Sequence, residues 1–149
     1  DRFMFSVWLD YPKFADEITI VKKTTSTYHY DLHTVISGEE IQFFQDLIRK
    51  VPVNDNVVQY AVKLAARSRP FTELAAEVAN QYLKWGAGPR ASQYLVLGAK
   101  THAVLNGKYA PDIEDVQAVA PSILRHRIIK NYKAEAENIT VDEIIARLM

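Results

Sequence analysis

The clearest chemical signal in the chain is the segment Trp85-Gly86-Ala87-Gly88-Pro89-Arg90-Ala91-Ser92. Gly86 and Gly88 let the backbone turn tightly, and Pro89 is typical of the first position of a helix, where its missing N–H has no intrahelical partner anyway. Arg90 then lies in the first helical turn, where the helix dipole disfavours a cation. A helix N-terminus and a guanidinium together suit an anion such as phosphate. The alternative is an ordinary solvated or salt-bridged Arg90.

Two further groups of side chains are candidates for binding. Arg2 lies at the start of an apolar run and could face a neighbouring molecule. Arg125-His126-Arg127 forms a small basic cluster, which we expect on a surface or salt-bridged helix face rather than at a ligand. His29 and His33 have the i, i+4 spacing of two metal ligands on a helix. The polar, β-leaning sequence around His29 and the lack of an H-E-x-x-H pattern instead predict no metal site.

The chain lacks the motifs of nucleotide hydrolysis and of nucleophilic catalysis. Gly107-Lys108-Tyr109 is not a phosphate loop, which needs G-x-x-x-x-G-K-[ST] between a strand and a helix so that consecutive N–H groups surround the phosphates. No G-x-S-x-G elbow is present. Cysteine is absent, which excludes disulfides, Cys-ligated zinc and thiol nucleophiles and fits a reducing compartment. The residues alone therefore predict no catalytic constellation.

Length and charge narrow the class of protein further. The 149 residues suit one domain with a real hydrophobic core. Because 18 Lys and Arg balance 18 Asp and Glu, the chain lacks the basic excess of a dedicated nucleic-acid binder. No apolar run approaches the roughly 20 residues that span a bilayer. The chain opens on Asp1-Arg2-Phe3-Met4-Phe5 without an initiator Met, so we expect a piece of a longer protein.

Hydrophobic periodicity predicts helices everywhere after Pro12. Residues 3–9 are typical of a strand, which must pair with residues outside this chain or pack as an extended arm. Capping boxes at Ser37–Glu40 and Thr140–Glu143 mark two helix starts. The predicted helices cover about 13–25, 38–50, 55–68, 72–84 (capped by Thr72), 89–106 and 112–119, with a restart after Pro121, and 141–148. The predicted fold class is all-α, a bundle of about six to seven helices preceded by one short strand.

In a series of short sequence blocks the chain resembles the C-terminal part of the MoxR family of AAA+ ATPases. The matching blocks follow the family's order and spacing and extend over nearly the whole chain. They are Asp1-Arg2-Phe3-Met4-Phe5, Asp10-Tyr11-Pro12, Arg49-Lys50-Val51-Pro52-Val53, Trp85-Gly86-Ala87-Gly88-Pro89-Arg90-Ala91-Ser92-Gln93, Leu97-Gly98-Ala99-Lys100, Tyr109-Ala110-Pro111, Val119-Ala120-Pro121 and Leu124-Arg125-His126-Arg127-Ile128.

The resemblance implies a division of the chain and a role for its arginines. Residues 1–12 would be the last strand of the α/β ATPase core, and residues 13–149 would be the helical AAA+ lid. Arg90 would be the sensor 2 residue that contacts the nucleotide, within a cofactor-binding motif that includes Gly86, Gly88 and Pro89. Arg2 would be the catalytic arginine finger, presented in trans to the neighbouring subunit.

The resemblance also implies what the whole protein needs. It would bind and hydrolyse ATP with Mg²⁺ in a homo-oligomeric ring, expected to be a hexamer, and would remodel or mature a client protein in the cytoplasm. Neither nucleic acid nor a membrane span is expected. The Walker A and Walker B segments would lie upstream, so we expect the isolated chain to bind no cofactor stably and to be inactive. An arginine from a neighbouring subunit contributes roughly 10³–10⁵ to the rate of phosphoryl transfer.

Two other classes of function remain open. The chain could be a freestanding helical interaction module that binds a partner through an apolar face of residues 38–68, in which case Phe43 or Phe44 would be exposed. A nucleic-acid-binding helical domain is suggested by Arg125, Arg127 and nearby lysines. The central third of the chain, residues 51–100, carries six basic and three acidic residues, and this small excess does not favour steep salt-dependent binding.

Overall fold

The structure, a computed structural model, describes residues 2–27 and 30–149. Within these residues it contains eight α-helices and one two-stranded antiparallel sheet, which confirms the predicted all-α class. The elements are α1 (Phe14–Thr24), α2 (Gly38–Lys50), α3 (Asp55–Arg67), α4 (Glu77–Tyr82), β1 (Leu83–Trp85), α5 (Pro89–Leu105), α6 (Ile113–Leu124), β2 (Ile129–Lys130), α7 (Tyr132–Ala136) and α8 (Val141–Leu148).

Local sequence signals place most of the helix ends. The predicted capping boxes are formed at Ser37 before α2 and at Thr140 before α8, and Asp112 with Asp115 makes a third before α6. α5 begins with Pro89 at its first position. It ends before Gly107, whose φ of 73° is the left-handed conformation that glycine adopts without strain.

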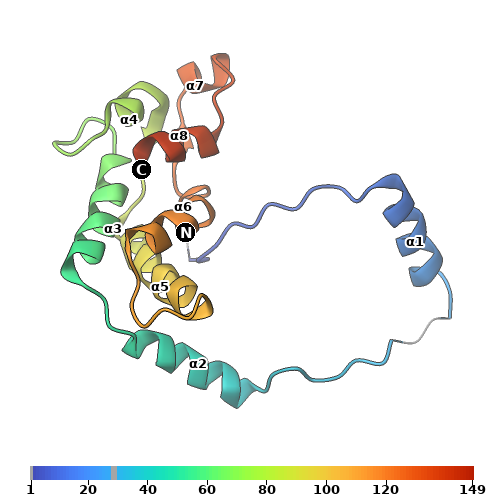
Figure 1. Cartoon of the computed structure of the whole chain (residues 1–149). Coiled ribbons are helices and arrows are strands. Elements are labelled where there is room, and N and C mark those ends of the chain that lie inside the picture. Colours follow the sequence, from blue (N-terminus) through green and yellow to red (C-terminus); the bar gives the residue numbers. More distant parts are fainter. Residues whose placement is uncertain (1, 28–29) are drawn as a thin grey trace.

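α5 is the central helix of the bundle, lying between α3 and α6 (Figure 1). Its buried face is built from small residues with one larger one, namely Ala91, Leu95, Ala99 and Ala103. Small side chains bring the neighbouring backbones close, and a Cβ added at Gly98 would lie 3.1 Å from Ile123 and 3.2 Å from Val119 of α6. α8 closes the core with Ile144, Ile145 and Leu148.

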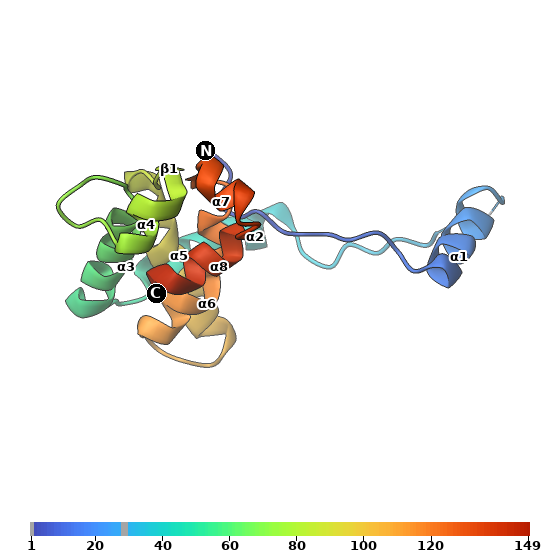
Figure 2. The same cartoon turned by 90° about the horizontal axis from the view of Figure 1, so that it is seen from above.

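The first third of the chain lies outside this core. The described residues before Val57 include none that is buried. An extended segment leads from the first described residues, beside α6, to α1, and residues 30–37 lead into α2 (Figure 1). The view from above shows α1 far from the other helices (Figure 2). α1 and α2 therefore contain no buried residue, although α2 lies beside α5.

Three details of the predicted elements were wrong. Residues 3–9 form no strand, because no neighbouring strand lies beside them in the described part of the chain. They form an extended arm instead, the second of the two arrangements that a lone strand allows. The helix from 112 does not stop at 119, since α6 continues through Pro121 to Leu124. Burial of Ile123 and Leu124 outweighs the hydrogen bond that proline cannot donate.

The helix predicted over 72–84 was also wrong. Thr72 caps nothing, because its hydroxyl donates to the carbonyl of Arg69, two residues after the end of α3. Phe71 adopts a positive φ of 59°, and its N–H donates to Asn80. Only Glu77–Tyr82 is helical, and the following residues form β1, which pairs with β2 in the one small sheet of the described residues.

Candidate functional site

Arg90 lies where the sequence predicts it, in the first turn of α5. It is exposed, and within the part of the chain that the structure describes it makes no hydrogen bond or ion pair. The N-cap residue, Gly88, has no side chain to cap the helix, and the first turn of α5 contains no acidic residue. The first turns of α2, α6 and α8 each contain two. The N-terminus of α5 therefore combines the positive end of the helix dipole with an exposed cation, an arrangement suited to an anion.

The turn before α5 is anchored to the end of α3. Ser68 is buried; its hydroxyl accepts a hydrogen bond from the N–H of Ala87 at 2.9 Å and donates to the carbonyl of Ala65. The Nε of Arg69 donates to the carbonyl of Ala87 at 2.8 Å. The backbone of Gly86 lies so close that a Cβ there would be 2.2 Å from the carbonyl oxygen of Ser68. Close approach of two backbones thus requires Gly86.

Gly88 and Pro89 differ from Gly86 in their surroundings. Gly88 has φ −79° and ψ 178°, values that any residue adopts, and a Cβ added there would meet no atom within 4 Å. Pro89 is exposed and occupies the first helical position. The two residues set the direction of the first turn of α5 and so the position from which Arg90 extends.

Arg2 is brought to the same end of α5 through its backbone. The hydroxyl of Tyr94, one helical turn after Arg90, donates to the carbonyl of Arg2 at 3.1 Å. The Arg127 guanidinium lies over the Tyr94 ring, 5.0 Å from its centroid, and donates to the carbonyls of Phe3 and Met4. The two arginines selected from the sequence, 88 positions apart, therefore share one region of the surface.

The basic cluster 125–127 differs from its prediction. Arg125 is salt-bridged as expected, with its Nε 2.9 Å from Asp142 and its Nη1 donating to the carbonyl of Ser6. Arg127 is buried rather than superficial, with 8% of its surface exposed. Arg127 lies in the turn after α6, three positions after Leu124 and four after Ile123, both of which are buried, so the helical period of α6 already pointed to a buried position.

The pKa values of this cluster follow from its burial. Burial lowers the pKa of Arg127, Tyr94 opposes that change, and the charge of Arg90 adds to it. Burial also lowers the pKa of His126, against a hydrogen bond from its Nε2 to the carbonyl of Phe3 at 3.1 Å. His126 is accordingly neutral near pH 7, and Arg127 remains a cation because a guanidinium keeps its proton in proteins. Arg90 and Arg127 are thus electrostatically coupled.

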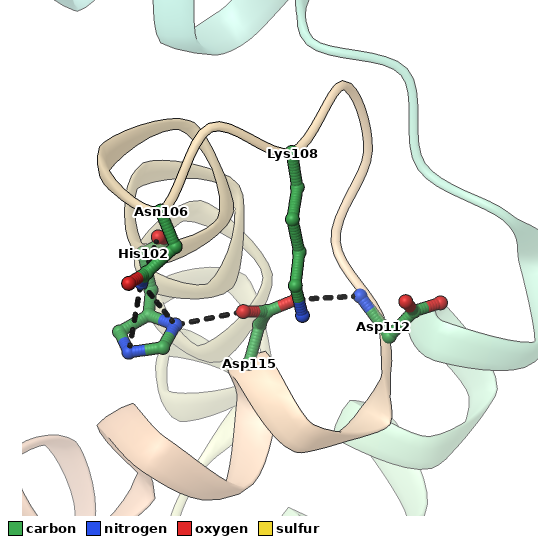
Figure 3. A network of polar contacts seen from close by, with 5 residues as sticks. All are labelled: His102, Asn106, Lys108, Asp112 and Asp115. Carbon is green, nitrogen blue, oxygen red and sulfur yellow. Dashed lines mark hydrogen bonds and ion pairs between the residues drawn. The ribbon is translucent and has the colours of Figure 1, made fainter.

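A separate polar network joins the other end of α5 to α6 (Figure 3). Asp115 is 1% exposed and accepts from three donors: His102 Nδ1 at 2.7 Å, Lys108 Nζ at 3.0 Å and the N–H of Asp112 at 2.8 Å. Burial would raise the pKa of Asp115, but the hydrogen bonds from Asp112, His102 and Lys108 outweigh it and the pKa is lowered. These contacts hold the loop between α5 and α6 in place.

Only one member of the histidine pair considered from the sequence belongs to the residues that the structure describes. His29 lies outside the described residues, and His33 is an exposed neighbour of Asp31, 3.5 Å away. In residues 2–27 and 30–149, no group of three His, Cys, Asp or Glu side chains could hold a metal ion. Over the same residues, no helix is both long and apolar enough to cross a membrane.

Comparison with known proteins identifies the class to which this fold and site belong. Residues 75–148 match the family model of the AAA lid domain, and they are an AAA lid domain. This region contains α4 to α8, the turn before α5 and both Arg90 and Arg127.

Individual relatives confirm the resemblance to the C-terminal lid part of MoxR-family ATPases. The chain is 27% identical to the chaperone MoxR1 of Mycobacterium tuberculosis and 26% identical to the uncharacterized protein YeaC of Bacillus subtilis, over its whole length in both cases. A crystal structure from Cytophaga hutchinsonii, described as a "putative ATPase", superposes on 99% of the chain with a TM-score of 0.82 and 30% identity. The chain spans only 39%, 44% and 45% of the lengths of MoxR1, YeaC and that structure.

Proposed function

We propose that this chain is the lid-bearing part of an ATP-hydrolysing MoxR-like AAA+ protein, and that Arg90 acts there as the sensor 2 residue and Arg2 as the arginine finger. The observation that carries the proposal is the hydrogen bond from Tyr94 to the carbonyl of Arg2, which joins the segment of one arginine to the helix of the other. Each arginine is exposed, so its guanidinium is available to phosphate oxygens.

The chemistry of these groups suits phosphoryl transfer. Charge spreads over the oxygens of the transferred phosphoryl group in the transition state, and guanidinium groups stabilise it electrostatically. The dipole of α5 adds partial positive charge at the helix N-terminus, beside Arg90. Gly86, Gly88 and Pro89 form the turn that presents Arg90. Mg²⁺ would neutralise phosphate charge, and we propose that its ligands belong to the rest of the parent protein.

The proposal includes the assembly and its work. Arg2 would extend toward ATP bound by a neighbouring subunit of a homo-oligomeric ring, and a change at Arg90 after hydrolysis would move α5 and the lid. The ring, a hexamer in this proposal, would act on a client protein in the cytoplasm. The name of the relative MoxR1, a chaperone, supports a client protein as the target of that movement.

The test uses the full-length parent ATPase with Arg2→Ala, Arg90→Ala and, as a control on α8 remote from both, Arg147→Ala. We expect Arg2→Ala to lower turnover on the order of 10³-fold, as for arginine fingers, without loss of nucleotide binding. Arg90→Ala should weaken binding of a fluorescent ATP analogue and lower turnover. Turnover at the wild-type rate in both variants would contradict the proposal. The isolated chain should hydrolyse no ATP.

A mixing experiment tests whether Arg2 acts on a neighbour. Arg2→Ala protein retains its own phosphate loop, and a phosphate-loop variant of the parent retains Arg2. If Arg2 acts in trans, mixed rings contain some interfaces with both intact partners, and turnover recovers in part. An absence of recovery in rings that are shown to mix would place the action of Arg2 within its own subunit.

The interaction-module alternative has one observation in its favour. The side chains of Phe43 and Phe44 on α2 are 63% and 50% exposed. A groove of about 540 Å³ runs beside them between α2 and α5, lined by Met4, Ile36, Ile41, Phe44, Gln45, Ile48, Arg49, Tyr94, Leu97 and Thr101. Self-association of the purified chain that is abolished by Phe43→Ser with Phe44→Ser would favour this alternative. A monomer at high concentration would count against it.

A further inference from the structure

The backbone of residues 2–6 is held against helices α3 to α8, the helical body, mainly by the side chains of one short segment, Arg125–Arg127. Arg127 donates to the carbonyls of Phe3 and Met4, His126 to that of Phe3, and Arg125 to that of Ser6 at 3.0 Å. In the same segment the N–H of Ser6 donates to the carbonyl of Ser122 at 2.7 Å. No hydrogen bond joins residues 7–13 to the helices of the body among the described residues. The arm is therefore held at its first residues only.

Arg127 is the centre of this attachment. Its Nη1 donates both to Met4, at 3.1 Å, and to the carbonyl of Ile123 within α6, while its Nη2 donates to Phe3. A planar guanidinium presents these donors in a fixed fork, which a lysine ammonium cannot reproduce. Because the group is largely buried, each contact is made in a medium that strengthens charge-assisted hydrogen bonds.

The same guanidinium is connected to α5. It lies over the ring of Tyr94, whose hydroxyl holds the carbonyl of Arg2. Tyr94 and Arg90 are four residues apart on α5, and positions i and i+4 lie on one face of a helix. A continuous set of contacts thus runs from Arg90 through one turn of α5 to Tyr94, and from there to Arg2 and Arg127. A movement of the start of α5 displaces the arm with it, unless these contacts break.

We propose that Arg127 is a positioning residue that couples Arg2 to Arg90. A displacement of α5 at the nucleotide beside Arg90 is transmitted through Arg127 to Arg2, which is directed at the nucleotide of the neighbouring subunit. The inference rests on the proposed function of Arg2 and Arg90, but the mechanical attachment can be measured without it. Arg127 is not a catalytic residue in this scheme, because its Nη1 and Nη2 donate to the carbonyls of residues 3, 4 and 123. It acts through the backbone that carries Arg2.

The attachment is tested in this chain by hydrogen exchange at the amide of Ser6, with Arg127→Lys as the variant. Lysine keeps the positive charge and loses the fork, so exchange at Ser6 should become about tenfold faster, the effect of losing one hydrogen bond to a charged group. Amides in the middle of α5 should keep their rates. Arg147→Lys is the matched control, since Arg147 also lies over a tyrosine ring, that of Tyr82 at 6.0 Å, but makes none of the side-chain hydrogen bonds to residues 2–6. Unchanged exchange at Ser6 in Arg127→Lys would overturn the proposal.

A second variant covers the case in which Arg127→Lys unfolds the chain. Tyr94→Phe removes only the hydroxyl that donates to Arg2 and keeps the ring under Arg127. It should accelerate exchange at Ser6 to a smaller extent than Arg127→Lys, and the melting temperature should change little. If the Arg127→Lys protein is unfolded, an unchanged exchange rate at Ser6 in the Tyr94→Phe protein would likewise overturn the coupling.

The functional half of the inference is tested in the full-length ATPase. Arg127→Lys should lower kcat about tenfold and bring the Hill coefficient for ATP toward one, whereas the affinity for a nucleotide analogue stays at the wild-type value. A merely structural role would lower the amount of active protein and leave the Hill coefficient unchanged, and that result would overturn the proposal. If Arg2→Ala and Arg90→Ala abolish turnover and Arg127→Lys does not affect it, only the coupling fails. If those two variants turn over normally, the proposed function itself fails.

Discussion

The helices within residues 2–50 and those within residues 55–148 include similar sequence signals at their starts. They differ in how much of their apolar surface is buried by other helices. α2 and α8 both begin with a complete capping box, and in each the backbone hydrogen bond to the cap residue lowers the pKa of the third helical residue, Glu40 or Glu143. Yet α2 has no buried residue, whereas α8 buries Ile144, Ile145 and Leu148. Signals that start and orient a helix are therefore independent of whether its apolar face is covered.

This difference has consequences for stability. Burial of apolar surface supplies most of the free energy of folding, roughly 25 cal/mol per Å². An isolated helix shorter than about 12–15 residues is marginal in water, and α1 has 11 residues with its apolar side in solvent. We therefore expect residues 55–148 to unfold as one cooperative unit and α1 to contribute little to that transition. Matched pairs of variants, one from each region, test this expectation.

The largest contrast should come from the same substitution at two isoleucines. Ile123 on α6 is 0% exposed, and Ile18 on α1 is 40% exposed. Ile123→Ala removes buried methyl groups and leaves a cavity, at a cost of about 2–5 kcal/mol. Ile18→Ala should change the free energy of unfolding by less than about 0.5 kcal/mol. Urea denaturation followed by circular dichroism measures both, and equal shifts in the two midpoints would mean that α1 belongs to the cooperative unit.

Two glycines give the next contrast. At Gly86 an added Cβ would lie 2.2 Å from the carbonyl oxygen of Ser68 and 2.5 Å from the Cα of Arg69, which is backbone that cannot turn away. Gly86→Ala should cost about 3 kcal/mol, at the upper end for overpacking. At Gly38, the first residue of α2, a Cβ would meet nothing within 4 Å, so Gly38→Ala should be neutral or slightly stabilising.

Gly88→Ala serves as a control within the same turn as Gly86. It has an unremarkable φ and open space around its Cα, so thermal melting of this variant should match wild type. A large loss of stability in Gly88→Ala, or none in Gly86→Ala, would show that the close approach of the turn to α3 is not what constrains this segment.

Much of this fold follows from local chemistry, and the parts that do not follow depend on partners distant in sequence. The capping boxes, Pro89 and Gly107 are recognisable one helical turn at a time, and the predicted ends of α2, α5 and α8 were confirmed. β1 is three residues long and exists because β2 pairs with it from more than 40 positions away. No periodicity within residues 83–85 contains that information.

The candidate site shows the same limit. Arg90 was selectable from the sequence because a proline and two glycines define its turn, and Arg2 because the resemblance marks it. The burial of Arg127 was missed because a cluster of basic residues suggests a solvent-exposed helix face. Only the path of the arm explains how the charge of Arg127 is accommodated. A buried arginine needs carbonyl partners, and here they come from residues more than 120 positions earlier.

Asp115 provides an electrostatic test of the body. Asp115→Asn keeps the shape of the side chain but removes the charge that pairs with Lys108 and His102, so it should cost about 1–3 kcal/mol. Asp142→Asn, the exposed half of the ion pair with Arg125, should cost less than about 1 kcal/mol. Chemical denaturation near neutral pH compares the two. A loss at Asp142 that equals the loss at Asp115 would contradict the importance of burial.

The pH dependence of the Asp115 contribution has a definite sign. The pKa of Asp115 in the folded protein lies below its ordinary value of 3.8, so the unfolded chain takes up this proton first as the pH falls. The stabilisation is complete above that ordinary value and is lost as the pH falls through the lowered folded value. The stability difference between wild type and Asp115→Asn should therefore be constant near neutrality and shrink in acid. A difference that grows below pH 4 would contradict the lowered pKa.

The smallest contrast, and the most direct comparison of the two regions, uses the two capping boxes. Ser37 and Thr140 each accept from the N–H of the third helical residue, at 3.2 Å in both cases. Replacing such a cap by alanine destabilises a helix by about 1 kcal/mol. Because α8 is part of the core, Thr140→Ala should lower the free energy of global unfolding by that amount. Ser37→Ala should fray the start of α2, with a small loss of helical signal, and leave the midpoint unchanged. If Ser37→Ala shifts the midpoint as far as Thr140→Ala does, α2 unfolds together with the body, and its contact with α5 is stronger than its exposed face suggests.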